Sequence, residues 1–148
     1  MTLPAAIMHV LAVMALLCNL SLAPVLPEPE PWEPAPADVA LVSRTIWGET
    51  RGCPYNEPWA QGCCVVNRVD DPRWGDTIEA VVLQPNQFQG YSPNNPEEPF
   101  HDMAREILIA WHNGDTGVPK DMCFCEGKNG HQIFRTTWER TEETRYWP

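Results

Sequence analysis

The chain has 148 residues, of which 43% are hydrophobic, and this composition fits a single folded domain of ordinary size. Its formal net charge is −10, and no block of Lys or Arg interrupts the acidic sequence. Nucleic-acid binding depends on a basic surface. We therefore exclude DNA and RNA as expected partners. Separately, we expect the protein to be a monomer.

The first 23 residues are predominantly apolar from Ile7 to Leu22 and end in Ser-Leu-Ala, a small-x-small pattern. This pattern is typical of an export signal peptide that is removed after translocation. No Lys or Arg precedes Arg44, so an uncleaved membrane anchor over residues 1–23 is the alternative. Both interpretations place the remainder of the chain outside the cytoplasm, in the periplasm, the cell envelope or the extracellular space.

A proline-rich segment follows, with six prolines among the thirteen residues 24–36, interleaved with glutamates. Such a sequence has neither an apolar face nor a regular hydrogen-bonding pattern, which indicates an extended, polyproline-like spacer. We predict a Pro/Glu-rich linker over residues 24–37 and a folded domain over residues 38–148.

The first predicted helix begins with Asp38 as its N-cap and ends before Gly52, a residue type that is common just after helices. Val39, Val42 and Ile46 recur at helical spacing and form its apolar stripe. The helix therefore extends over the sequence WGET that precedes Arg51.

Two more helices follow. Asn56 is suited to cap a helix over about residues 57–69, and Asp76 with Glu79 three residues later has the spacing of a capping box for a short helix that stops before Pro85. We expect both to pack against the first helix.

Residues 85–99 are rich in Pro, Asn and Gly and predict a loop, whereas residues 100–113 have the clearest apolar periodicity of the chain. Residues 122–126 and 132–137 alternate in polarity around a Gly-Lys-Asn-Gly turn, which predicts a β-hairpin. The predicted fold class is α+β and mainly α, with one small hairpin.

Glu49 is the residue that this map does not explain. It lies on the apolar stripe of the first helix, beside Trp47 and between two glycines, and natural cores avoid an unpaired carboxylate. A structural explanation is an ion pair with Arg51 or Arg68, or a side chain that extends from the helix end into solvent. The functional one is a general acid, because an apolar environment keeps a carboxyl group protonated toward neutral pH.

Five segments occur in a characteristic order. They are RTIWGETRG at 44–52, CCVVNRV at 63–69, DDPRWGDTIEAVV at 70–82, LQPNQFQGY at 83–91 and FCEGKNGHQIF at 124–134. In this order they resemble the motifs of SleB-type cell wall hydrolases, the catalytic domain of spore-cortex-lytic enzymes, over about residues 38–138. The resemblance implies a lysozyme-like fold of the lytic-transglycosylase kind and the glycan strands of peptidoglycan as substrate.

In that family the glutamate of a GEARGE-type motif is the catalytic acid, and the matching residue is Glu49; the second glutamate of the motif is replaced by Cys53. A single acid is enough to cleave the glycosidic bond if the sugar's own acetamido group or C6 hydroxyl meets the charge that develops at C1. Glu49 would protonate the leaving oxygen and then take the proton of the attacking C6 hydroxyl, which gives a 1,6-anhydro product. If water attacks instead, Glu57, Asp70 and Asp71 are the candidate helpers.

The loop sequence QPNQFQGY combines amides with aromatic rings, the groups that bind sugars. We therefore predict that Gln87, Phe88 and Tyr91 contact the substrate, together with Gln84. For Phe88, the alternative is a side chain that fills the core.

Asn67 and His131 complete the candidate binding residues. Asn67, beside Arg68 at the end of the second helix, either orients Glu49 or forms a structural polar pair. His131 lies in the predicted hairpin, where the family has a similar Gly-His-Phe motif, and we predict that it contacts substrate. A structural or simply exposed histidine is the alternative.

Six cysteines are present, and removal of a signal peptide would leave five. In an exported protein they favour disulfides, for instance from Cys53 or Cys63 to the region of Cys123. The Cys123-x-Cys125 spacing does not match the usual zinc knuckles. We therefore expect neither a metal site nor a cofactor.

Two rival functions are considered beside a peptidoglycan glycosidase. One is a peptidoglycan-binding module without activity, for which a costly acid at Glu49 would have no purpose. The other is an amidase that cuts the stem peptide, which normally depends on a metal site.

Overall fold

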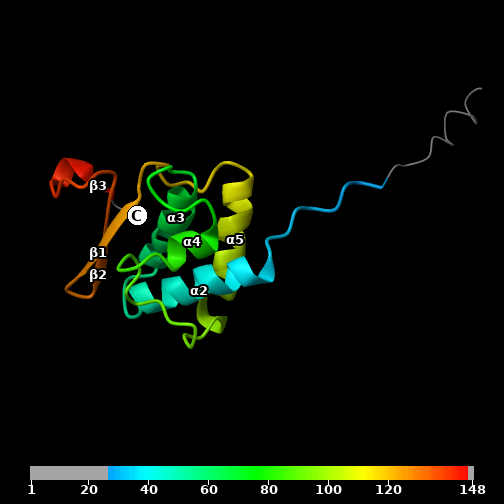
Figure 1. The fold of residues 1–148 in the computed structure, drawn as a ribbon, viewed down its shortest axis with the longest axis horizontal. Coiled ribbons are helices and arrows are strands. Elements are labelled where there is room, and N and C mark those ends of the chain that lie inside the picture. Colours follow the sequence, from blue (N-terminus) through cyan, green and yellow to red (C-terminus); the bar gives the residue numbers. More distant parts are fainter. Residues whose placement is uncertain (1–26, 147–148) are drawn as a thin grey trace, which may run out of the picture. The chain divides into compact units, whose positions relative to one another are not determined.

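The computed structural model describes residues 27–146 (Figure 1). The described residues from Trp32 onward belong to one compact unit, which contains all the helices and strands below. The predicted signal peptide or anchor over residues 1–23 lies outside the described residues. Among residues 27–146, no helix has the length and apolar character needed to cross a membrane.

The first described helix, α2, spans Pro36–Thr50. Ala35 is its N-cap and makes no side-chain capping bond, so the prediction of Asp38 as N-cap is wrong. Proline at the first helical position explains the earlier start, because its fixed φ suits a helix and its missing N–H needs no partner there. The other end is as predicted: Gly52 follows with a φ of 85°.

The central helix, α3, spans Asn56–Val69, and the short α4 spans Ile78–Val82. Thr77, rather than Asp76, caps α4, since its hydroxyl accepts the Ala80 N–H at 3.1 Å. The capping pattern was therefore placed one residue too early. A 3-10 turn, η1 (Glu98–Phe100), leads into α5.

The fourth helix, α5, spans His101–His112, close to the predicted range. The hairpin consists of β1 (Phe124–Lys128) and β2 (His131–Arg135), which pair antiparallel. Asn129 and Gly130 form a two-residue turn with φ values of 55° and 77°, as tight hairpin turns require. The hairpin prediction is thus confirmed.

A third strand, β3 (Arg145–Tyr146), pairs antiparallel with β2, after a second 3-10 turn, η2 (Glu142–Thr144). The sheet order is β1-β2-β3. Strand β3 was not predicted, because two residues are too few to show an alternating pattern. The α+β, mainly α fold class is confirmed, with a three-stranded sheet in place of a lone hairpin.

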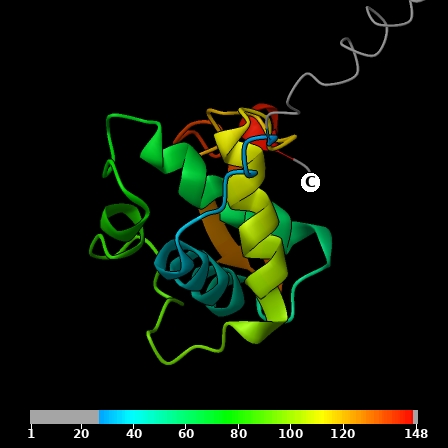
Figure 2. The same ribbon diagram turned by 90° about the vertical axis from the view of Figure 1, so that its right-hand side faces the viewer.

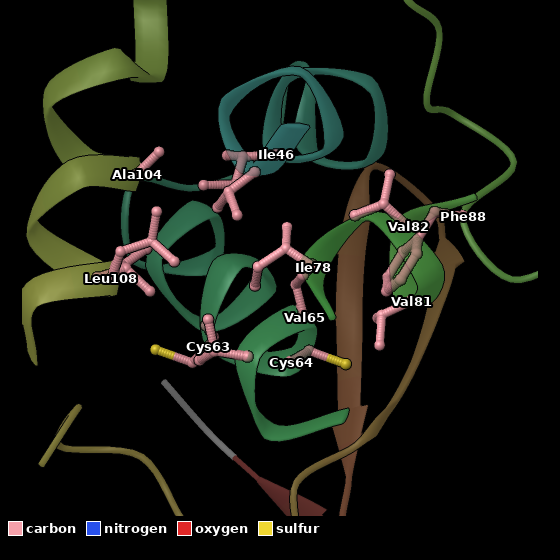
Figure 3. Close-up of a cluster of buried hydrophobic side chains, with 14 of the residues drawn as sticks. Ile46, Cys63, Cys64, Val65, Ile78, Val81, Val82, Phe88, Ala104 and Leu108 are labelled. Atoms are coloured by element: carbon pink, nitrogen blue, oxygen red, sulfur yellow. The ribbon is translucent and has the colours of Figure 1, made fainter. Parts of the chain in front are cut away.

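The core lies where α2, α4 and α5 surround α3 (Figures 2 and 3). At Gly62 of α3, an added Cβ would meet Ile107 of α5 at 2.5 Å and Ile46 of α2 at 3.0 Å. The three helices therefore cross closely at this glycine. The hairpin packs on α3 from the other side, and this arrangement brings the end of α2 close to the sheet.

The folded unit begins earlier than the predicted linker boundary. Trp32 stacks on His112 with ring centroids 4.1 Å apart, and Glu33 forms an ion pair with Arg105. The end of the proline-rich segment is thus attached to α5.

Candidate active site

Glu49 lies in the last turn of α2 and is half-buried. Its Oε1 accepts the backbone N–H of Gly90 at 2.7 Å. Burial raises the pKa of the Glu49 carboxyl above its ordinary value, and the Gly90 hydrogen bond and the charge of Arg68 oppose this increase. Because desolvation is the largest contribution, Glu49 keeps its proton to a higher pH than an exposed glutamate.

The Gly90 N–H reaches Glu49 because two glycines touch. A Cβ on Gly48 would lie 1.9 Å from the Gly90 carbonyl oxygen, and a Cβ on Gly90 would lie 2.4 Å from that of Gly48. Asn95 holds the contact from the loop side by donating to the carbonyls of Gly90 at 2.9 Å and Arg44 at 3.1 Å. The loop after α4 is thereby fastened to the last turn of α2.

The hairpin fastens Glu49 from the opposite side. Gln132 of β2 donates from its side chain to the Glu49 carbonyl at 2.5 Å. Its own backbone N–H donates to the buried Glu57 carboxylate at 2.6 Å, and His131 Nδ1 lies 2.9 Å from the other Glu57 oxygen. Glu57, in the first turn of α3, thus holds the hairpin that holds the main chain of Glu49.

We expect the Glu57→Ala variant to lose about 1–3 kcal/mol of unfolding free energy, because the Gln132 N–H would be left buried without its acceptor. Urea denaturation followed by circular dichroism measures this loss. Glu106→Ala, which changes an exposed glutamate of α5, is the control and should stay within about 0.5 kcal/mol of the unmodified protein. Equal midpoints for the two variants would contradict the anchoring role.

Glu49 opens onto a cavity of about 340 Å³, a size that suits a small ligand or part of a larger one. Ten residues from five parts of the chain line it: Glu49, Arg68, Asn86, Gln87, Gln89, Phe124, Cys125, Glu126, Gly127 and Trp138. Amides, charged groups and an exposed aromatic ring therefore surround the acid.

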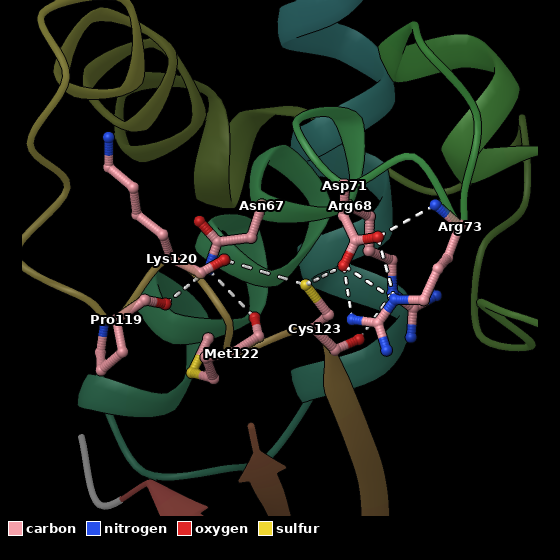
Figure 4. Close-up of polar contacts among 8 residues, drawn as sticks. All are labelled: Asn67, Arg68, Asp71, Arg73, Pro119, Lys120, Met122 and Cys123. Carbon is pink, nitrogen blue, oxygen red and sulfur yellow. Dashed lines mark hydrogen bonds and ion pairs between the residues drawn. The ribbon is translucent and has the colours of Figure 1, made fainter. Parts of the chain in front are cut away.

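Arg68 organises the wall of this cavity. Its Nε donates to the Cys123 carbonyl at 2.7 Å (Figure 4), and its Nη1 donates to Gln87 at 3.3 Å. Its guanidinium lies over the rings of Trp74 and Phe88, at 4.0 and 4.6 Å. Within residues 27–146 Glu49 forms no ion pair, so the structural explanation of Glu49 by pairing with Arg68 or Arg51 is wrong.

Of the predicted loop residues, Gln87 lines the cavity with Glu49. Phe88 is buried in the core, and Tyr91 is half-buried against that core; neither belongs to the cavity wall. The core alternative for Phe88 therefore matches its position. Gln84 also lies outside the set that lines the cavity.

The structure also separates Asn67 and His131 from the cavity. Asn67 is buried and donates to the carbonyls of Pro119 at 2.9 Å and Met122 at 3.0 Å (Figure 4), which matches the structural alternative. It faces a different direction from Arg68 because adjacent helical residues diverge by about 100°. His131 and Glu57 line another cavity, of about 370 Å³.

The carboxylates suggested as helpers lie elsewhere. Asp70 accepts the indole N–H of Trp111 at 2.8 Å. Asp71 binds Arg73, which lowers the pKa of Asp71 to about 2. Glu57 binds the hairpin. None of these three carboxylates lines the Glu49 cavity.

Glu126 and Trp138 are among the cavity residues that the sequence did not predict. Glu126, the second carboxylate in the cavity wall, forms ion pairs with Arg135 at 3.7 Å and Arg140 at 3.3 Å. Trp138 is 72% exposed, and its ring centroid lies 4.6 Å from that of Phe124. The available signal was a lone tryptophan in the polar stretch RTTWERT, where no apolar pattern predicts that it belongs to the core.

A larger cavity of about 690 Å³ is lined by aromatic side chains that include Tyr55, Trp59, Phe100 and Tyr146. It does not contain Glu49. We place the candidate active site in the smaller cavity because it combines a desolvated acid with hydrogen-bonding groups. In the described part of the chain, no three His, Cys, Asp or Glu side chains are grouped as a metal site requires.

The raised pKa of Glu49 has a consequence for stability. Below its ordinary value of 4.5 the carboxyl is protonated in both the folded and the unfolded chain. As pH rises through the raised folded-state pKa, the folded protein must ionise a half-buried group, and it loses stability relative to the unfolded chain.

We therefore expect the stability of Glu49→Gln, relative to the unmodified protein, to increase as pH rises through this window. Urea midpoints measured from acidic to slightly alkaline pH test this, with Glu79→Gln, an exposed site on α4, as control. A relative stability of Glu49→Gln that falls with rising pH would contradict the assignment.

The family model described as Cell Wall Hydrolase matches residues 52–146, which is more than half of the chain and begins just after Glu49. The spore cortex-lytic enzyme of Oceanobacillus iheyensis is 29% identical over 77 residues, and that of Bacillus subtilis is 26% identical over 77 residues. These alignments cover 52% of this chain but only 28% and 25% of the relatives. No solved structure matches the chain. By the extent of the family match, the chain belongs to the Cell Wall Hydrolase family.

Proposed function

We propose that the protein cleaves the glycan strands of peptidoglycan, with Glu49 as the single acid and base. The observation that carries this proposal is the position of Glu49, a half-buried carboxyl of raised pKa that opens onto a polar cavity. Membership in a cell wall hydrolase family and similarity to proteins named spore cortex-lytic enzyme support the same substrate.

The hydrogen bonds of Glu49 assign roles to its two oxygens. Since Oε1 accepts the Gly90 N–H, Oε2 is the oxygen that carries the proton toward the cavity. It protonates the bridging oxygen of the glycosidic bond, and the Gly90 N–H stabilises the carboxylate that remains. Glu49 then removes a proton from the attacking hydroxyl.

Two outcomes follow from the identity of that hydroxyl. Attack by the C6 hydroxyl of the same sugar gives a 1,6-anhydro product, as in a lytic transglycosylase, and needs no second acid. Attack by water gives hydrolysis, as in a muramidase, and Glu126 is then the candidate helper because it shares the cavity. We favour the first route, since Glu126 is already paired with Arg135 and Arg140.

Substrate binding in this proposal depends on Gln87 and Trp138. The Gln87 amide, oriented by Arg68, hydrogen-bonds a sugar hydroxyl or acetamido group, and the exposed face of Trp138 stacks on a sugar ring. Contacts with Tyr91 and His131 stay predictions, and they require a glycan strand that extends beyond the Glu49 cavity. Because Phe88 and Asn67 are buried, we assign them supporting rather than binding roles.

Such a substrate requires a protein that works outside the cytoplasm, as the predicted export signal also implies. We therefore propose a location in the cell envelope or the extracellular space. The signal or anchor over residues 1–23 would place the domain there, and attachment to the membrane through that segment is the alternative to release.

Digestion of purified sacculi followed by mass spectrometry of the soluble products tests the function. We expect muropeptides that end in 1,6-anhydro-muramic acid and carry intact stem peptides. Reducing ends in their place would favour the muramidase route. Free stem peptides would show an amidase, and sedimentation of the protein with sacculi without any release would show a binding module.

A further inference from the structure

Two thiols meet at the wall of the Glu49 cavity. Cys64 of α3 is fully buried, and Cys125 of β1 is half-buried and lines the cavity. The two thiols lie close enough that each shifts the pKa of the other. Figure 3 shows the sulfur of Cys64 pointing toward the hairpin, whereas that of the neighbouring Cys63 points to the opposite side.

The alignment of β1 on α3 explains why these two thiols are opposed. Gln61, Cys64 and Arg68 are spaced at i, i+3 and i+7 and so share one face of α3. Arg68 donates to the Cys123 carbonyl at 2.7 Å, and Gln61 donates to the Cys125 sulfur at 3.6 Å. These two bonds hold Cys123 and Cys125 against the face of α3 that carries Cys64, and of the two Cys125 has the stronger interaction with Cys64.

Of the other described cysteines, Cys123 makes the smallest contribution to the pKa of Cys64. Glu57 lies beside Cys53, and Thr116 lies beside Cys63. The Cys123 sulfur lies 3.8 Å from an Asp71 oxygen. The disulfides expected from the sequence, from Cys53 or Cys63 to the Cys123 region, therefore do not correspond to the contacts of the fold.

The two thiols also differ in reactivity. The interaction with Cys64 and the charge of Arg68 lower the pKa of Cys125, whereas the same interaction and burial raise the pKa of Cys64. Cys125 is therefore the more readily ionised thiol of the pair, and it is the one that lines the cavity. Cys64 is placed to react second.

We propose that Cys64 and Cys125 are a disulfide-forming pair that links α3 covalently to β1 beside the candidate active site. The oxidant is a disulfide, either a small molecule of the glutathione type or an oxidoreductase. The Cys125 thiolate attacks one sulfur of that disulfide, forms a mixed disulfide and expels one thiolate. Cys64 then gives up its proton, attacks the Cys125 sulfur and expels the second, so that one disulfide is reduced as one forms.

The linkage would act on the cavity through β1, which contributes Phe124, Cys125, Glu126 and Gly127 to its wall. It would also close a long loop between α3 and the hairpin, and such a closure raises the stability of the fold. In this protein the bond is expected to raise the unfolding temperature of the oxidised form. The proposal does not depend on the glycosidase function, since its readout is covalent.

Peptide mapping of the full chain tests the proposal. The folded protein is incubated with oxidised glutathione, remaining thiols are alkylated after unfolding, and the digest is analysed by mass spectrometry. We expect one linked pair of peptides, which contain Cys64 and Cys125. Linkage of any other pair, or full alkylation of both cysteines after oxidation, would overturn the proposal.

Matched variants distinguish the Cys64–Cys125 pair from the neighbouring cysteines. Cys63→Ser and Cys123→Ser should keep the linkage, whereas Cys125→Ser and Cys64→Ala should lose it together with the gain in unfolding temperature on oxidation. Circular dichroism shows whether each variant is folded. Alanine replaces Cys64 because a serine hydroxyl buried at this position would destabilise the fold. An oxidation-dependent rise in unfolding temperature that persists in Cys125→Ser would also refute the pair.

Discussion

Replacing Glu49 by glutamine is expected to reduce the release of muropeptides from purified sacculi by at least about 10²-fold, the usual minimum for loss of a general acid. Glutamine cannot supply a proton to the leaving oxygen, but its carbonyl can still accept the Gly90 N–H. The Gln132 bond goes to the backbone of Glu49 and is also preserved. Activity should therefore be lost without loss of the fold.

The measurement is the rate of soluble product formation, with far-ultraviolet circular dichroism as the check of folding. Glu79→Gln is the matched control, because it makes the same chemical change at an exposed site of α4 and should leave the rate unchanged. Full activity of a folded Glu49→Gln would remove the basis for the proposed mechanism. Loss of activity together with unfolding would instead indicate a structural role.

Replacing Gly48 by alanine is expected to have the second largest effect. The added methyl group would lie 1.9 Å from the Gly90 carbonyl oxygen and 2.8 Å from the Asn95 amide, so the loop must move away from α2. Overpacking of this kind costs about 1–3 kcal/mol. The displaced loop would also withdraw the Gly90 N–H from Glu49, and activity should fall well beyond the fraction of protein that unfolds.

Thermal unfolding and sacculus digestion are measured on the same preparation. Gly114→Ala is the control, because Gly114 has a φ of 85° and open space around it. That change should cost about 1–2 kcal/mol through backbone strain alone. If Gly48→Ala and Gly114→Ala lose stability and activity in the same proportion, the Gly48–Gly90 contact has no particular role at the site.

The part of the site that could be predicted was the part encoded in one helix. The apolar positions Val39, Val42 and Ile46 are buried in the core, and their spacing places Glu49 partly out of solvent. For the two glycines that flank Glu49, the sequence predicted no packing contact. Gly48 instead makes room for the backbone of Gly90, a contact between segments that periodicity within either segment cannot show.

The binding residues were harder to predict because their orientation depends on tertiary packing. Asn67 and Arg68 are adjacent, yet the first faces the carbonyls of Pro119 and Met122 and the second lines the cavity. Trp138 reaches the cavity from beyond the end of β2, outside any periodic element. Apart from the segment around Trp138, the segments that line the cavity lie within the resembling motifs, but motif order could not identify which side chain of each segment reaches the acid.

The cavity wall is assembled from α2, α3, the loop after α4, β1 and the segment around Trp138, which are far apart in sequence. A partly denatured molecule that lost any one of these contacts would retain much of its helical signal while losing the chemistry. The rate of wall digestion during gentle heating should therefore report disassembly at least as early as circular dichroism does. For the same reason, a fragment cut before the hairpin should be inert even though it keeps its acid.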